Sequence, residues 1–251
     1  VILTPSPTFS MYKLTGLALD KEVIETELDE QFDLDLGDIN KKIKQKDPDL
    51  IFLATPNNPT GNCFSKDKIL KILDSTDAIV VVDEAYFDYS KISFIEYLSK
   101  YKNLMILRTL SKIGFASLRL GILIGDSDLL VEVNKSRLPY NINSLSQAIT
   151  KVALDNIDEI NVKVEQIIEE KNKLSELLAD LNGVTVYPSD ANFFFIKVED
   201  ADYLFNELIK EDILIRNFNR PGRLNNCIRI TIGTADENEK VVSALTRILS
   251  V

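Results

Sequence analysis

Histidine and tryptophan are absent from the 251-residue chain, and cysteine occurs only twice. Without histidine, Ser-His-Asp and Cys-His nucleophile systems are excluded, and so is any histidine-ligated metal. Lysine is then the natural side chain for moving protons. The two cysteines, Cys63 and Cys227, lack the spacing of a metal site, and so few thiols fit a reducing compartment. We therefore predict that no metal is bound.

Long apolar runs and concentrated basic charge are also missing. No stretch approaches the ~20 apolar residues that span a bilayer, and no signal peptide is visible, so we predict a cytoplasmic protein without membrane contact. The formal net charge is -10 and the isoelectric point is about 4.7. No basic cluster is dense enough to follow a phosphate backbone, which excludes a nucleic-acid partner. The length permits a large core in one or two domains.

Two apolar runs end in polar residues that suggest a site. Ile79–Val82 ends in Asp83, and Leu104–Leu107 is followed within five residues by Lys112. Neither run alternates, which indicates strands buried on both faces in a parallel α/β sheet, where ligands bind beyond the carboxyl ends. A carboxylate that can bond a protonated pyridine nitrogen and an amine that can react with an aldehyde suit pyridoxal 5'-phosphate. Alone, Asp83 could equally cap a helix and Lys112 could be a solvated surface amine.

Periodicity and turn residues predict the remaining elements. Leu17–Leu28 is expected to be a strand with its approach, and Leu50–Ala54 and Ile122–Ile124 to be strands. Helices are predicted at Leu36–Lys44, Ser65–Leu73 (with Ser65 as N-cap), Leu145–Leu154 and Ile157–Leu181, the last stopped by Gly183. The C-terminal part alternates in α+β fashion, with strands at Val184–Tyr187, Asn192–Val198, Ile213–Arg216 and Cys227–Ile232 and helices at Ala201–Lys210 and Glu237–Leu249.

Three motifs, in this order and spacing, resemble the fold-type I aminotransferases: Thr55–Gly61 (TPNNPTG), Val82–Tyr86 (VDEAY) and Thr109–Lys112 (TLSK). Within that superfamily the chain is most similar to histidinol-phosphate aminotransferases, nearly end to end, from Pro5–Phe9 to Ile228–Thr234. The resemblance also implies that roughly a quarter to a third of a family subunit is missing before the first residue.

The resemblance implies an α/β fold with a mostly parallel central sheet, flanking helices and a smaller α+β C-terminal domain. Residues 1–155 would form the cofactor-binding large domain and residues 156–251 the small domain. The helix between them is poor in glycine and proline, so we expect the domains to meet at a helix and not at a flexible linker.

The resemblance assigns five residues to the ring of pyridoxal phosphate. Lys112 would bond it covalently and act as the catalytic base, and Asp83 would hold the proton on its ring nitrogen. Asn58 and Tyr86 would both bond its phenolic oxygen. Phe9 would stack on the ring at a position where many relatives carry tyrosine.

Three more residues would hold the phosphate group of the cofactor: Thr109, Ser111 and Arg119. In this sequence Arg119 follows Lys112 by seven residues, whereas the commonest family pattern has eight. We expect a loop that is one residue shorter, which Gly114 permits because glycine tolerates unusual backbone angles.

The substrate residues implied by the resemblance are Arg229, Arg216 and Asn192. Arg229 would bind an α-carboxylate, Arg216 the phosphate of histidinol phosphate, and Asn192 would lie near the substrate. Judged without the resemblance, the two arginines fit edge-strand surface charge equally well, and Asn192 fits a turn.

The resemblance therefore implies pyridoxal-phosphate-dependent transamination between histidinol phosphate and 2-oxoglutarate or glutamate, in histidine biosynthesis, by a homodimer. A phosphothreonine-type decarboxylase and an aromatic aminotransferase of the same fold are alternatives. A catalytically idle binding or regulatory module is an alternative of another class, although intact Lys112, Asp83 and Asn58 argue against it.

Overall fold

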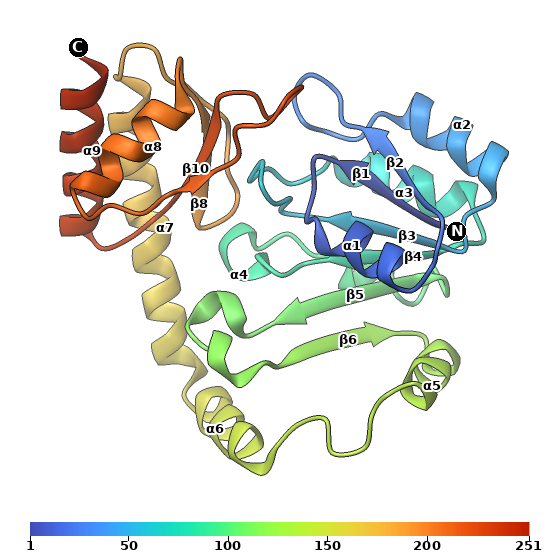
Figure 1. The fold of residues 1–251 in the computed structure, drawn as a ribbon. Helices are drawn as coiled ribbons and strands as arrows, with labels where there is room; N and C mark the ends of the chain where they lie inside the picture. Colours follow the sequence, from blue (N-terminus) through green and yellow to red (C-terminus); the bar gives the residue numbers. More distant parts are fainter. Residues whose placement is uncertain (251) are drawn as a thin grey trace.

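The computed structural model describes residues 1–250, which form two β-sheets with helices packed around them (Figure 1). The larger sheet has six strands in the order β2-β1-β3-β4-β5-β6, and the smaller has four in the order β7-β8-β10-β9. The strands of the larger sheet are β1 (Ile2–Ser6), β2 (Val23–Glu27), β3 (Leu50–Ala54), β4 (Ile79–Asp83), β5 (Leu104–Thr109) and β6 (Gly121–Gly125). Those of the smaller sheet are β7 (Thr185–Val186), β8 (Phe193–Lys197), β9 (Arg216–Asn217) and β10 (Cys227–Thr231).

The larger sheet is parallel except at one edge, where β6 runs antiparallel to β5. In β4, Val80, Val81 and Val82 are at most 5% exposed, which confirms that this apolar run is covered on both faces. Asp83 is in register with Leu107 of β5. The polar ends of these two parallel strands therefore meet at one edge of the sheet, as the sequence predicted.

Nine α-helices and three short 3-10 turns are assigned among residues 1–250. The α-helices are α1 (Met11–Ala18), α2 (Leu36–Lys46), α3 (Lys66–Ser75), α4 (Phe87–Ser90), α5 (Ser127–Lys135), α6 (Ser144–Asp155), α7 (Ile157–Ala179), α8 (Ala201–Lys210) and α9 (Ala235–Leu249). The turns are η1 (Ile95–Tyr97), η2 (Ser111–Ile113) and η3 (Ala116–Leu118). Within this described range, no helix combines the length and the apolar character needed to cross a membrane.

Helix α7 connects the two sheets. In Figure 1 it runs from α6, below the larger sheet, up to the smaller sheet, where α8 and α9 cover the outer side. One core lies around the larger sheet but also includes Phe195 and Cys227 from the smaller one. A second core packs the smaller sheet against α7, α8 and α9. The shared core makes the contact between the two sheets apolar.

Several local expectations differ from the structure, including the strand expected at Ile213–Arg216, which is extended only at Arg216–Asn217. The region expected to be a strand from Leu17 begins inside α1, and only Val23–Glu27 is extended. Gly16 allows this helix to pack closely, since a Cβ there would lie 2.6 Å from the side chain of Val23. Helix α5 was not predicted. Ser65 does precede α3, but its hydroxyl donates to Asp33 at 2.5 Å and makes no cap bond to the helix.

Candidate active site

Asp83, the last residue of β4, has its carboxylate held by two donors. The Tyr12 hydroxyl donates to Oδ2 at 2.5 Å, and the Ala85 amide donates to Oδ1 at 2.9 Å. Burial raises the pKa of Asp83, while the Tyr12 bond, the Ala85 bond and the charge of Lys112 oppose that shift. Asp83 is therefore neither a helix cap nor a solvated surface carboxylate.

Tyr12 is the main site residue that sequence reasoning missed. Its ring lies parallel to Phe52 of β3, with centroids 4.7 Å apart, and edge-on to Phe9 at 5.5 Å. Burial raises the pKa of Tyr12 well above its usual value, so the phenol stays protonated. A tyrosine three residues after Phe9 was a signal in the sequence, but nothing there indicated that it reaches a residue 71 positions away.

Lys112 lies in η2, just beyond the end of β5. Its amine is 5.0 Å from the centre of the Tyr86 ring, and its carbonyl accepts a 2.7 Å hydrogen bond from the Tyr89 hydroxyl. Lys112 and Asp83 share one cavity, although no ion pair within 4 Å joins them among the described residues. The cavity is lined by Phe9, Tyr12, Ala54, Pro56, Asn58, Asp83, Ala85, Tyr86 and Lys112. Five predicted cofactor residues are thus brought together.

Asn58 connects this cavity to the smaller sheet. Its amide oxygen accepts a 2.6 Å hydrogen bond from the guanidinium of Arg229, which also lies 4.7 Å above the Phe193 ring. Burial lowers the pKa of Arg229, and the nearby charge of Arg216 lowers it further against an opposing effect of Tyr86. The Nε atom of Arg229 is buried and has no partner within residues 1–250.

Arg216 and Arg229 face each other across β9 and β10, in register. Like charges directly opposite on an antiparallel pair repel. Within the part of the chain that the structure describes, neither guanidinium forms an ion pair with a carboxylate. Arg216 is exposed, with its guanidinium 5.6 Å from the Phe218 ring. The pair is therefore a cationic position that lacks an internal counter-charge.

The predicted phosphate residues are only partly assembled. The Thr109 hydroxyl donates to the Ser111 hydroxyl at 2.8 Å and accepts the Ser111 amide at 3.0 Å. Arg119 is exposed in a left-handed conformation, and its guanidinium donates to the Ala116 carbonyl at 3.4 Å. Gly114, between η2 and η3, has a φ of +104°, which supplies the tight turn that a shortened loop requires.

Asn192 lies beside Tyr89 at the start of β8. Its backbone carbonyl accepts the amide of Ile232 at 2.9 Å. Burial raises the pKa of Tyr89 to about 12, and the Asn192 side chain opposes that rise. Because the Tyr89 hydroxyl bonds the carbonyl of Lys112, Asn192 is positioned to support the lysine loop.

Glu84, for which no role was predicted, is buried in an ion pair with Arg108 directly behind the site. Its carboxylate accepts two bonds from Arg108, at 3.0 and 2.9 Å, one from the Ser93 hydroxyl at 2.9 Å and one from the Phe94 amide at 2.6 Å. The Arg108 guanidinium also stacks 3.6 Å above the Phe87 ring. This pair ties the end of β4 to the end of β5.

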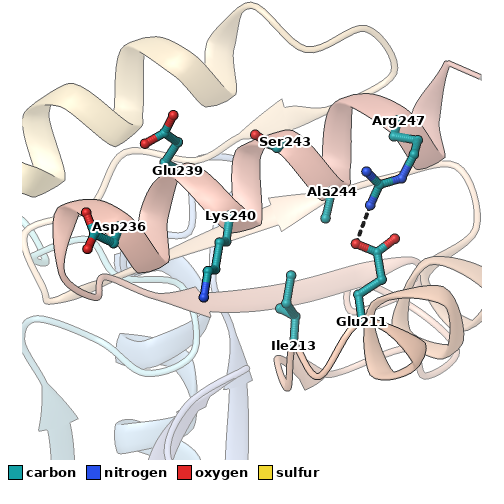
Figure 2. Close-up of a pocket in the computed structure, with 8 residues that line it drawn as sticks. All are labelled: Glu211, Ile213, Asp236, Glu239, Lys240, Ser243, Ala244 and Arg247. Atoms are coloured by element: carbon teal, nitrogen blue, oxygen red, sulfur yellow. Dashed lines mark hydrogen bonds and ion pairs between the residues drawn. The ribbon is translucent and has the colours of Figure 1, made fainter.

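A larger hollow lies on the smaller sheet's outer side, away from these residues. It has a volume of about 520 Å³ and is lined from α9, from Ile213 and from Glu211, whose carboxylate pairs with Arg247 (Figure 2). Acidic and basic side chains are mixed around its rim, and none of the predicted site residues is among them. Size alone therefore does not identify the site, whereas the chemistry around Lys112 does.

Comparisons with known proteins agree on one family. The family model described as "Aminotransferase class I and II" matches residues 1–245. A histidinol-phosphate aminotransferase of Vesicomyosocius okutanii is 41% identical over 98% of this chain and 70% of its own length.

Solved structures support the same fold. The histidinol-phosphate aminotransferase of Clostridium acetobutylicum superimposes with a TM-score of 0.93 at 25% identity, over 99% of this chain and 78% of that one. The enzyme of the same name from Sinorhizobium meliloti, solved in complex with pyridoxal-5'-phosphate, has a TM-score of 0.89 at 22% identity, covering 99% of this chain and 70% of that one. At that identity the second likeness supports the fold alone.

Proposed function

Because this chain belongs to the class I and II aminotransferase family, we propose that it is a pyridoxal-phosphate-dependent enzyme that transfers an amino group between histidinol phosphate and 2-oxoglutarate in histidine biosynthesis. The observation that carries the reaction class is the cavity that Lys112 shares with Asp83, Tyr86 and Asn58. The substrate assignment is supported by the printed name of the 41% identical relative.

The chemistry of the cavity fits the proposed cofactor. A carboxylate, an amide, a phenol and an amine line it. Among the described residues, the amine of Lys112 and the carboxylate of Asp83 form no ion pair with each other. Tyr12 and Ala85 already satisfy part of the Asp83 carboxylate and fix its position. When bound, pyridoxal phosphate supplies a ring that withdraws electrons from the substrate carbon.

Each side chain would then have a defined task. Asp83 would hold the proton on the ring nitrogen, and Asn58 and Tyr86 would bond the phenolic oxygen. Phe9, 41% exposed at the mouth, would cover one face of the ring. The remaining contacts, to the phosphate group, would come from Thr109, Ser111 and Arg119.

Lys112 would be the covalent attachment point and the proton carrier. Once the amine of a substrate has displaced it, its Nζ atom would hold and move the proton of the substrate Cα. The bond from Tyr89 to the Lys112 carbonyl would keep the loop in place while the side chain moves.

Arg216 and Arg229 would determine which substrates bind. Arg229 would bind the α-carboxylate of glutamate, and Arg216 would bind the phosphate of histidinol phosphate, with Asn192 nearby. Guanidinium groups suit both anions because they donate two parallel hydrogen bonds. Since histidinol phosphate has no carboxylate, the two substrates would use the arginines differently.

Two measurements test the proposal. Borohydride reduction of the cofactor-loaded protein, followed by peptide mapping, should find the cofactor on Lys112, and attachment to Lys135 would contradict the assignment. A half-reaction screen should show the visible band of the cofactor bleached by glutamate and by histidinol phosphate. Bleaching by phosphothreonine with release of carbon dioxide would identify a decarboxylase, and bleaching by phenylalanine would identify an aromatic aminotransferase.

The organisation of the whole protein follows from the family as part of this proposal. We propose that residues 1–155 bind the cofactor, that residues 156–251 form the small domain, and that the enzyme acts as a cytoplasmic homodimer. In support of this division, strands β1 to β6 of the larger sheet precede residue 156 and strands β7 to β10 of the smaller sheet follow it. Helix α7 begins at the proposed boundary. Sedimentation of the loaded enzyme would test the dimer directly.

A further inference from the structure

Tyr12 is the only side chain within residues 1–250 that donates a hydrogen bond to Asp83. The bond is short, 2.5 Å, and the phenol is only 8% exposed. The direction of the hydroxyl is set by packing, because the ring is stacked on Phe52 with an interplanar angle of 6° and braced edge-on by Phe9. The hydroxyl is therefore aimed at Asp83 before any ligand binds.

The two donors bond different oxygens of the Asp83 carboxylate. Ala85 takes Oδ1 through its backbone amide, which is fixed by the turn after β4, and Tyr12 takes Oδ2. With both present, the plane of the carboxylate is defined. With only Ala85 left, the carboxylate would be free to turn about the bond to that single donor.

We propose that Tyr12 is a positioning residue for cofactor binding, whose hydroxyl keeps the Asp83 carboxylate anionic and oriented toward the ring nitrogen. This inference rests on the proposed function of the same site. Tyr12 does not touch the reacting atoms and acts only through Asp83.

The sign of the effect follows from ordinary hydrogen-bond chemistry. A phenol that donates to a carboxylate stabilises the ionised form, so the carboxylate competes less well for a shared proton. The proton then stays on the ring nitrogen. Burial raises the pKa of Asp83, and the Tyr12 bond is the largest influence opposing that rise, ahead of Ala85 and Lys112. Tyr86 is the other titratable group that faces Tyr12.

The test uses Tyr12→Phe in the cofactor-loaded enzyme, with Tyr101→Phe as a matched control. The Tyr101 hydroxyl also donates to an aspartate, Asp74, at 2.8 Å, and that pair lies outside the cavity. The main readout is the nitrogen-15 resonance of ring-labelled pyridoxal phosphate bound to each variant, and the second is the dissociation constant of the cofactor.

We expect Tyr12→Phe to move the resonance toward that of an unprotonated pyridine and to weaken cofactor binding roughly tenfold to a hundredfold, the effect of losing one bond to a charged group. Tyr101→Phe should leave both unchanged. Phe52→Leu removes the stacking partner but keeps the hydroxyl, so it should move the resonance the same way by less. Phe52→Leu also provides the test if Tyr12→Phe fails to fold.

An unchanged resonance in both Tyr12→Phe and Phe52→Leu would overturn the inference, even if turnover fell. Failure of the role of Tyr12 and failure of the proposed function give different results. Wild-type enzyme that binds the cofactor on Lys112 but transaminates nothing would contradict the function and leave Tyr12's role standing. Normal transamination with an unmoved resonance would contradict Tyr12's role alone.

Discussion

Replacing Arg108 with methionine should destabilise the protein strongly, because it leaves the Glu84 carboxylate buried without its counter-charge. The Glu84 side chain has 0% exposure, and the pair joins the ends of β4 and β5 that carry Asp83 and the Lys112 loop. Methionine fills similar space above Phe87, so the change removes charge and hydrogen bonds more than volume.

The size of the effect follows from the contacts that remain. Of the hydrogen bonds to the Glu84 carboxylate, the two from Arg108 disappear, while those from Ser93 and Phe94 persist. Breaking a buried ion pair by removing one partner costs about 3–5 kcal/mol, and the surviving donors place this case near the lower end. A loss of about 3 kcal/mol corresponds to a fall in Tm of roughly 6–12 °C in a protein of this size.

Thermal unfolding followed by circular dichroism measures the change. Lys66→Met is the matched control, since it removes an exposed ion pair with Glu96 and should leave the Tm almost unchanged. The double variant Glu84→Gln/Arg108→Met should regain stability, because no charge is then left buried. A Tm of Arg108→Met equal to that of the Lys66 control, or a double variant no more stable than Arg108→Met, would contradict a cost of the buried charge.

Three further results are expected. Asp83→Asn should keep the cofactor bound but reduce turnover by ~10²–10³, since an amide cannot hold the ring-nitrogen proton, and near wild-type rates would contradict this role. Arg216→Ala should weaken the histidinol phosphate half-reaction by roughly tenfold to a hundredfold, and Arg229→Ala should affect glutamate most, with equal losses on both substrates contradicting the assignment. In cofactor-free protein, burial raises the pKa of Asp83, so only at pH values between its ordinary and its raised pKa does the folded state bind a proton that the unfolded state does not. Urea unfolding should therefore show stability increasing as pH falls through the raised pKa, and Asp83→Asn should remove this contribution.

The central strands and most helices were predictable because their signals are local. β3 and α8 have the predicted bounds, and α2 begins at the predicted residue. Buried parallel strands appear as uninterrupted apolar runs, and Asp35 caps α2 with bonds to two backbone amides. For these elements, the residues nearby in the sequence were sufficient to predict the secondary structure.

Helix α1 was missed for a physical reason that also explains the missed tyrosine. Its apolar residues do not share one buried face, since Tyr12 is buried whereas Met11, Leu14 and Leu17 are each about half exposed. It is held by close packing of Gly16 on Val23. Because the helix was not predicted, the position of Tyr12 beside Asp83 was not predicted either; that position depends on the stacking of Tyr12 on Phe52 of β3.

The arginine pair illustrates what sequence can and cannot say about a site. The family resemblance implied that both arginines bind anions, but only the strand register reveals that Arg216 lies directly opposite Arg229. That arrangement costs stability, because like charges repel and the Nε atom of Arg229 is buried without a partner in the described chain. Asn58 offsets only one donor of Arg229. Folding therefore does not account for the pair, whereas an anionic substrate would supply the charge and acceptors that the protein itself leaves out.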